Sequence, residues 1–186
     1  MRSPRERMVV SAALLIRERG AHATAISDVL AHSGAPRGSA YHHFPGGRTQ
    51  LLCEAVDYAG GHIAAIISEA DGSLGLLDTL IAKYRQQLLD TDYRAGCPIA
   101  AVSVEAGEPV ARAAAVFDRW SDLIAQRFIA DGISVDRSTE LAVLATSALE
   151  GALLLARARR DLTPLDIVGR QLRSLLSAEL PEGSPG

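Results

Sequence analysis

The sequence predicts an all-α protein, in which an N-terminal helix-turn-helix unit of three helices precedes a larger helical domain, with about nine helices in total. Apolar residues recur at helical spacing along most of the chain, and no segment shows sustained strand alternation. Residues 26–44 contain two short helical patterns joined by a tight turn at Gly34. The charge is also divided, because residues 1–50 are basic whereas the remainder is acidic.

The first helix is expected over residues 4–20. Ser3 and Glu6 have the spacing of a capping box, and Pro4 stands at the first helical position, where its fixed φ is favourable. Apolar residues within 8–16 trace one face of this helix. That face is expected to cover the two short helices and to complete the three-helix unit.

The segment 26–44 is the most informative part of the chain. An apolar face on residues 26–30 marks the first short helix, which ends at Gly34 because glycine tolerates the left-handed conformation found just past a helix. Pro36 then sets φ for the first turn of the second short helix. A helix-turn-helix of this kind places its second helix in the major groove of DNA.

Polar side chains suited to DNA contact cluster on the second short helix. The guanidinium of Arg37 can pair with guanine or phosphate, and the hydroxyls of Ser39 and Tyr41 can reach phosphate or base edges. Gly38 leaves room for the backbone to approach the duplex. The residues expected to pack inward are Ala40 and Phe44. A glycine turn also occurs in ordinary helical bundles, so the pattern alone leaves open a module that binds no DNA.

The string at residues 34–45, Gly-Ala-Pro-Arg-Gly-Ser-Ala-Tyr-His-His-Phe-Pro, resembles the recognition segment of the TetR/AcrR family of bacterial transcriptional regulators. The resemblance covers residues 5–58. Pro-Arg-Gly-Ser at 36–39, Phe-Pro-Gly-Gly at 44–47 and the later Gly-Cys-Pro at 96–98 together are similar to the LmrA/YxaF-like branch. The resemblance implies that the second short helix reads DNA and that Arg48 touches a phosphate. The DNA-binding residues expected in this way are Thr24, Pro36, Arg37, Gly38, Ser39, Tyr41, His42 and Arg48.

The sequence departs from the commonest pattern of that family at two capping positions. Pro36 stands where a Ser or Thr often caps the recognition helix, and Ala25 stands where a Thr or Ser often caps the helix before it. We therefore expect Thr24 to take the phosphate and capping roles.

The distribution of charge fits contact with DNA at one end of the protein. Residues 1–50 carry seven Arg against Glu6, Glu18 and Asp28, which gives +4, and the remainder of the chain gives −7 from twelve basic and nineteen acidic residues. A basic module on an acidic body is the electrostatic arrangement of a protein that touches DNA with that module alone.

The chain is expected to work in the cytoplasm. Cys53 and Cys97 are too few for a disulfide framework, so a reducing compartment is the default. No signal peptide is predicted. No membrane span or membrane partner is expected either, because the most apolar stretch, 141–156, is short and is interrupted by Glu150.

Further helices are expected over residues 48–70, 74–92, 99–105, 108–130, 134–160 and 163–178. The resemblance implies that the middle helices enclose a cavity for an apolar or aromatic small-molecule effector. Candidate wall residues are Tyr84, Leu88, Cys97, Val102, Glu105, Phe117, Trp120 and Ile124.

Simpler roles stay open for several of these wall residues. Trp120 also suits a core filler, and Cys97 suits a buried structural thiol. Glu105 lies in an apolar helix and needs a partner, which is either a ligand or a nearby Arg.

The last two helices have the pattern of a dimerisation face. Small residues on the first allow close helix approach, and apolar residues repeat at helical spacing on the second. The residues expected at this interface are Ala145, Ala148, Ala152, Leu172 and Leu175. An ordinary intramolecular core is the alternative for the same pattern.

Together these features predict a homodimeric, ligand-responsive repressor with residues 1–47 as its DNA-binding domain and 48–186 as its ligand-binding and dimerisation domain. A near-palindromic operator in double-stranded DNA is the expected partner. An activator of the same fold is one alternative, and a helical interaction module is another. An enzyme is not expected, because the sequence contains no catalytic motif, and no cofactor or metal site is expected, because adjacent histidines on a helix point in different directions.

Overall fold

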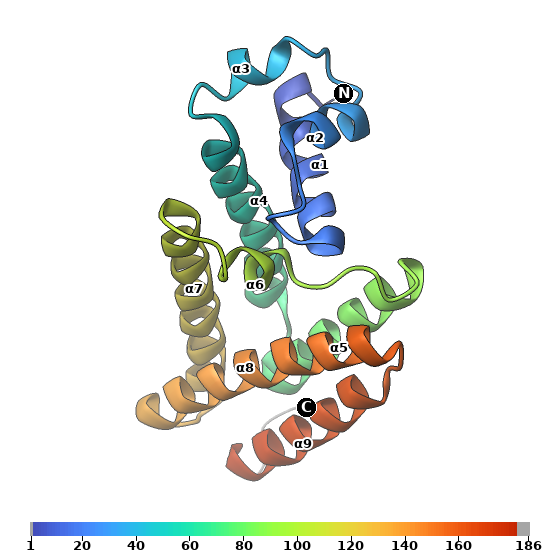
Figure 1. Ribbon diagram of the computed structural model, residues 1–186. Helices are drawn as coiled ribbons and strands as arrows, with labels where there is room; N and C mark the ends of the chain where they lie inside the picture. Colours follow the sequence, from blue (N-terminus) through green and yellow to red (C-terminus); the bar gives the residue numbers. More distant parts are fainter. Residues whose placement is uncertain (1, 182–186) are drawn as a thin grey trace. The chain divides into compact units, whose positions relative to one another are not determined.

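The computed structural model describes residues 2–181, and over these it contains nine α-helices and no strand (Figure 1). This confirms the predicted fold class. The helices are α1 (Pro4–Arg19), α2 (Ile26–Ser33), α3 (Ser39–His43), α4 (Gly47–Glu69), α5 (Gly72–Asp90), α6 (Pro98–Val102), α7 (Glu108–Ala130), α8 (Val135–Arg159) and α9 (Thr163–Glu179).

The helices form two compact units. Unit 1 contains the chain up to His62 together with Arg94–Val116, and unit 2 contains Ile63–Tyr93 and the chain from Phe117 onward. Helices α4 and α7 each contribute to both units. These structural units do not follow the functional boundary predicted at residue 47, because unit 1 also holds most of α4, all of α6 and the start of α7.

Unit 1 is built around α1, which packs against α2 and α6 (Figure 1). The predicted capping box is present, since the Ser3 hydroxyl accepts the Glu6 N–H at 3.2 Å and the Glu6 carboxylate accepts the Ser3 N–H at 2.7 Å. Met8, Val29 and Phe44 are fully buried in the core of this unit. Burial of these side chains fixes the helix-turn-helix against α1, because it removes their apolar surface from water.

Unit 2 places α9 beside both α5 and α8. Asp131 accepts the Ser73 N–H at 2.5 Å and the Ser73 hydroxyl at 2.6 Å, which satisfies polar groups at the start of α5. The ion pairs Arg85–Asp166 and Arg173–Asp78 join α5 to α9. The core of this unit includes the buried side chains Leu88, Leu153 and Leu165.

Helices α4 and α8 are each long and apolar enough to cross a membrane by length and composition alone, with half and 39% of their apolar windows buried inside the protein. The expectation from the stretch 141–156 was that no segment reaches this limit, and the full length of α8 does reach it. Core helices of water-soluble proteins pass the same test. Helix α8 also carries Arg137, Glu140 and Glu150, which are costly inside lipid.

Glycine in the middle of α4 allows close approach to α7 within unit 1. A Cβ built on Gly60 lies 2.6 Å from Cγ1 of Val116, which is closer than carbon atoms approach without displacement. A Cβ on the neighbouring Gly61 meets no described heavy atom within 4 Å. The close packing therefore requires glycine at position 60 and not at position 61.

Both cysteines carry free, buried thiols. In the case of Cys53, burial above all and the neighbouring carboxylate of Glu108 raise the pKa of the thiol, and the guanidinium of Arg112 only partly opposes this shift. A raised pKa lowers the fraction of thiolate, which is the reactive form of cysteine. Cys53 therefore has the chemistry of a structural thiol.

We expect Gly60→Ala to lower the free energy of unfolding by about 1–3 kcal/mol, because its methyl group overpacks against Val116. Gly61→Ala is the matched control, and it should raise that free energy by up to ~1 kcal/mol through helix propensity. Urea unfolding of both variants measures the difference. Equal changes in the two variants would contradict the packing role of Gly60.

We expect Cys53 to react slowly with iodoacetamide in the native protein at pH 8, since its raised pKa keeps the thiol protonated above the pH at which an ordinary cysteine ionises. The same protein in urea should be alkylated at the rate of a free cysteine. Mass spectrometry of the peptide containing Cys53 gives both rates. Similar rates in the two conditions would exclude a buried, protonated thiol.

Candidate nucleic-acid interface and effector cavity

The segment from Pro36 to His42 presents its polar side chains to solvent. Arg37, Tyr41 and His42 are exposed, with Tyr41 at 79% exposure. Together they offer a guanidinium, a hydroxyl and an imidazole on one exposed segment, which are groups suited to contacts with phosphates and base edges. The inward side of α3 is formed by Ala40 and Phe44, which are buried as predicted.

The start of α3 is held by a local hydrogen bond in place of a side-chain cap at Pro36. The Ser39 hydroxyl donates to the carbonyl of Pro36 at 2.7 Å, and the Ser39 N–H donates to the same carbonyl at 2.9 Å. The lone pairs of the Ser39 hydroxyl stay available as acceptors. Gly38 is exposed and its position has no described heavy atom within 4 Å of an ideal Cβ, so the backbone there is open to a close partner.

The roles expected for Thr24 are wrong. Its side chain is 3% exposed, and its hydroxyl donates to the Gly20 carbonyl at 2.8 Å inside unit 1. The N-cap of α2 is Ala25, whose N–H is accepted by the carboxylate of Asp28 at 3.3 Å. The third residue of the helix therefore satisfies the N–H of the capping residue, while the bond that a capping side chain would accept is absent, and the Thr24 hydroxyl is left to satisfy the Gly20 carbonyl.

Arg48 is bound inside unit 1 on three sides. Its guanidinium donates to the Ala21 carbonyl at 2.5 Å and to the Thr24 carbonyl at 3.4 Å, and it lies 3.6 Å from the carboxylate of Glu105. The side chain keeps 38% of its surface exposed. Arg48 thus joins the start of α4 to the α1–α2 loop and to the segment after α6, and a phosphate contact remains a prediction.

Three of the predicted wall residues meet in one cavity of unit 2. Tyr84 of α5 and Trp120 and Ile124 of α7 line a cavity of about 20 Å³. This volume holds a single water molecule, so the cavity is nearly closed in the present conformation. The sequence did not single out the other wall residues, which are Ile63, Ile67, Leu80, Thr146, Leu149 and Glu150.

The wall of this cavity combines apolar surface with two polar side chains of α8. The hydroxyl of Thr146 is buried and has no hydrogen-bond partner among the described residues, which is unfavourable unless something fills the site. Glu150 lies one helical turn further along. The sequence signal for this wall was Glu150, the single acidic residue in the most apolar stretch, 141–156.

The remaining candidates for the wall lie elsewhere. Leu88 is fully buried in the core of unit 2, and Phe117 packs edge-to-face on Trp120 with ring centroids 5.5 Å apart. Three others belong to unit 1, where they do not line the cavity: Cys97, Val102 and Glu105. Two roles were left open for Glu105, and in the structure its carboxylate pairs with an arginine, Arg48.

The exposed apolar face of α8 and α9 differs in part from the predicted one. Ala145, Ala152 and Leu172 are buried within the protomer, so they pack its core and are not presented to a partner. Ala148 and Leu175 are half-buried. The large apolar side chains that these helices leave exposed are Val135, Val143, Leu144, Leu154, Leu155 and Ile167.

Two family models match the chain. Residues 9–55 match the bacterial regulatory proteins of the tetR family. Residues 74–171 match the C-terminal domain of the LmrA/YxaF-like transcriptional regulators. The first match covers the helix-turn-helix, and the second runs from α5 into α9.

Individual proteins give the same result. The HTH-type transcriptional regulator Rv0196 of Mycobacterium tuberculosis is 79% identical over 99% of this chain and 100% of its own length. The HTH-type transcriptional regulator YxaF of Bacillus subtilis is 29% identical over 92% of this chain and 94% of its own length. The crystal structure of regulatory protein TetR from Rhodobacter sphaeroides has a TM-score of 0.80 at 18% identity, covering 91% of this chain and 96% of that one, which concerns the fold alone.

Proposed function

Because this chain belongs to the tetR family of bacterial regulatory proteins, in its LmrA/YxaF-like branch, we propose that it is a homodimeric repressor that a small molecule releases from a near-palindromic operator. The chain is a transcriptional regulator with a DNA-binding fold, and its family is not one of enzymes. The observation that carries the proposal is the exposure of Tyr41 and His42 on α3 and of Arg37 in the turn before it, while Ala40 and Phe44 anchor this segment in the core.

Helix α3 reads base edges in the major groove, and the chain around it holds the DNA backbone. Arg37 and Tyr41 make the contacts that depend on sequence, while Pro36, Gly38, Ser39 and His42 lie along the same exposed segment. Arg48 reaches a flanking phosphate with the part of its guanidinium that unit 1 leaves exposed. Residues 1–47 supply these contacts except for Arg48, so the functional DNA-binding domain ends at the start of α4.

The effector binds in the cavity among α4, α5, α7 and α8 of unit 2. Tyr84, Trp120 and the isoleucines of α4 offer apolar contact, which favours an apolar or aromatic ligand, and the buried Thr146 hydroxyl offers one hydrogen bond. The cavity has to widen to admit such a molecule, because it now has room only for water. A ligand that binds only the widened state shifts the protein toward that state.

Helix α4 carries the change to the DNA-binding residues, since the same helix lines the cavity at Ile63 and Ile67 and holds Arg48 in its first turn. Movement of α4 displaces Arg48 against the Ala21 and Thr24 carbonyls and against Glu105. A coupling free energy of about 1–3 kcal/mol between ligand and operator is enough for regulation.

Helices α8 and α9 form the dimer interface. The exposed side chains Leu144, Leu155 and Ile167 are supported by small residues of α8 at positions 147, 148 and 151, which fall on the face that contains Leu144. Such a face joins two copies through a four-helix contact with two-fold symmetry. The resulting dimer reads two half-sites about one or more helical turns apart, at ~34–36 Å for one turn.

The protein works in the cytoplasm, where its DNA partner lies. Activation of transcription is the alternative outcome for the same fold and the same contacts, and the order of promoter and operator decides between the two. A helical module that binds no DNA is the other alternative, and it would lack the salt-dependent affinity for duplexes that the proposed regulator has.

We expect Arg37→Ala and Tyr41→Ala each to weaken binding of operator DNA by about 1–3 kcal/mol, because each removes a base-edge contact. Tyr58→Ala is the matched control, since Tyr58 is an exposed tyrosine of α4 outside the recognition segment. Titration of a labelled operator duplex selected from random sequences measures all three affinities. Unchanged affinity of the α3 variants would remove the recognition assignment.

We expect Ala148→Asp to dissociate the dimer, because a carboxylate on the small-residue face of α8 would be buried without a partner. Ala115→Asp, at an exposed alanine of α7, is the control and should keep the oligomeric state of the original protein. Sedimentation equilibrium gives the mass of each variant. An unchanged mass for Ala148→Asp would move the interface away from this face.

A further inference from the structure

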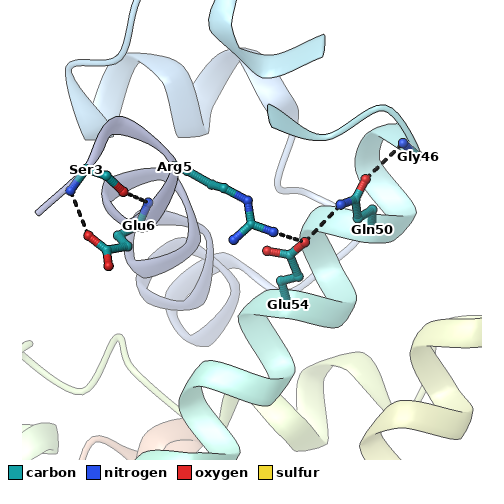
Figure 2. A network of polar contacts seen from close by, with 6 residues as sticks. All are labelled: Ser3, Arg5, Glu6, Gly46, Gln50 and Glu54. Atoms are coloured by element: carbon teal, nitrogen blue, oxygen red, sulfur yellow. Dashed lines mark hydrogen bonds and ion pairs between the residues drawn. The ribbon is translucent and has the colours of Figure 1, made fainter. Parts of the chain in front are cut away.

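Three polar side chains link α1 to the start of α4 in unit 1 (Figure 2). The carboxylate of Glu54 accepts a hydrogen bond from the Arg5 guanidinium at 2.6 Å and one from the Gln50 side-chain amide at 2.9 Å. The carbonyl of the Gln50 side chain accepts the backbone N–H of Gly46 at 2.9 Å. The chain of contacts therefore runs from α1 through α4 to the turn that follows α3.

A second contact of Arg5 reaches the other end of that turn. Its guanidinium carbon lies 5.4 Å from the centre of the Phe44 ring, within range of a cation–π interaction. Phe44 immediately follows α3, and its N–H donates to the Ala40 carbonyl at 2.8 Å. Because the Gly47 N–H also donates to the Phe44 carbonyl at 2.8 Å, both ends of the turn from Phe44 to Gly47 are fixed.

The start of α1 holds Arg5 in place for this contact. The Ser3–Glu6 capping box, drawn in Figure 2, closes the first turn of α1, from which Arg5 projects toward α4. Glu54 is the better protected partner, since its side chain is 22% exposed against 46% for Arg5. A carboxylate that receives two hydrogen bonds in this position sets the orientation of both donors.

We propose that Glu54 is a positioning residue for operator recognition, which holds the exit turn of α3 through Arg5 and Gln50 and so fixes the direction in which α3 presents Arg37 and Tyr41. In this role the side chains of Glu54, Arg5 and Gln50 do not have to touch DNA themselves. The inference rests on the proposed reading of DNA by α3.

Removal of the negative charge of Glu54 has an electrostatic effect on DNA binding that can be distinguished from a loss of positioning. A carboxylate close to a DNA-binding surface repels phosphate, so its removal alone strengthens binding to every duplex. Loss of positioning weakens binding to the operator. It does not change the affinity for other duplexes, because binding to those does not depend on the direction in which α3 points. The two effects therefore act with opposite sign on the affinity for the operator.

The test is the ratio of two affinities in Glu54→Gln, for the duplex selected by the original protein and for a scrambled duplex of the same composition. We expect this ratio to fall by roughly threefold to tenfold, because Gln keeps the shape and loses the charge-assisted hydrogen bond to Arg5. Asp57→Asn is the matched control, since Asp57 lies on the same helix, pairs with Arg112 and takes no part in the network. It removes the same charge and should leave the ratio unchanged.

Gln50→Leu provides the second variant. It changes no charge and removes the hydrogen bonds that join Glu54 to the Gly46 N–H, so the ratio should fall as it does in Glu54→Gln, and an unchanged ratio would overturn the role of this contact. Equal changes of both affinities in Glu54→Gln, or a fall of the same size in Asp57→Asn, would overturn the positioning role. An unchanged ratio in the variants would overturn the positioning role alone. Failure of the original protein to select any sequence would overturn the proposed function as well, so the two failures can be told apart.

Discussion

A helix of five residues does not hold its conformation in water, because a single turn fixes more backbone than its hydrogen bonds repay. The conformation of α3 therefore depends on burial of Ala40 and Phe44 against the rest of unit 1. Within α3 the helical repeat then places Tyr41 and His42 away from the buried Ala40, in solvent, and Arg37 is exposed in the turn that precedes the helix. Exposure of Tyr41 and His42 is thus a consequence of the burial of Ala40 and Phe44.

Helix α4 holds the segments on either side of the α2–α3 pair. Gln50 and Glu54 hold the turn that leaves α3 on one side, and Arg48 holds the loop that enters α2 on another. The same helix continues to the cavity of unit 2 at Ile63 and Ile67. Helix α4 thus contributes residues both to the surroundings of the candidate reading surface and to the candidate effector site.

Two charged residues of α4 each have an ion-pair partner outside this helix. Glu105, 16% exposed, is paired with Arg48, and Asp57 is paired with Arg112. Cys53 lies close to the charges of Asp57 and Arg112, and burial above all raises the pKa of its thiol. The unsatisfied hydroxyl of Thr146 is different, since it lies on the wall of a cavity that has room for a single water molecule. A ligand that supplies a hydrogen bond there would remove the cost of burying that hydroxyl.

Local chemistry allowed the sequence alone to predict the helix-turn-helix. The capping box at Ser3 and the left-handed turn at Gly34 with φ of 63° depend on residues within a few positions of one another, and the spacing of Ala40 and Phe44 marks them as the apolar positions of their segment. Only the tertiary structure decided the rest, because it depends on which helices meet. Thr24 proved to be buried, Arg48 proved to be bound by two carbonyls and Glu105, and the predicted wall residues were divided between two units. Periodicity identifies the apolar face of a helix, but the partner that covers this face is chosen by packing across the whole chain.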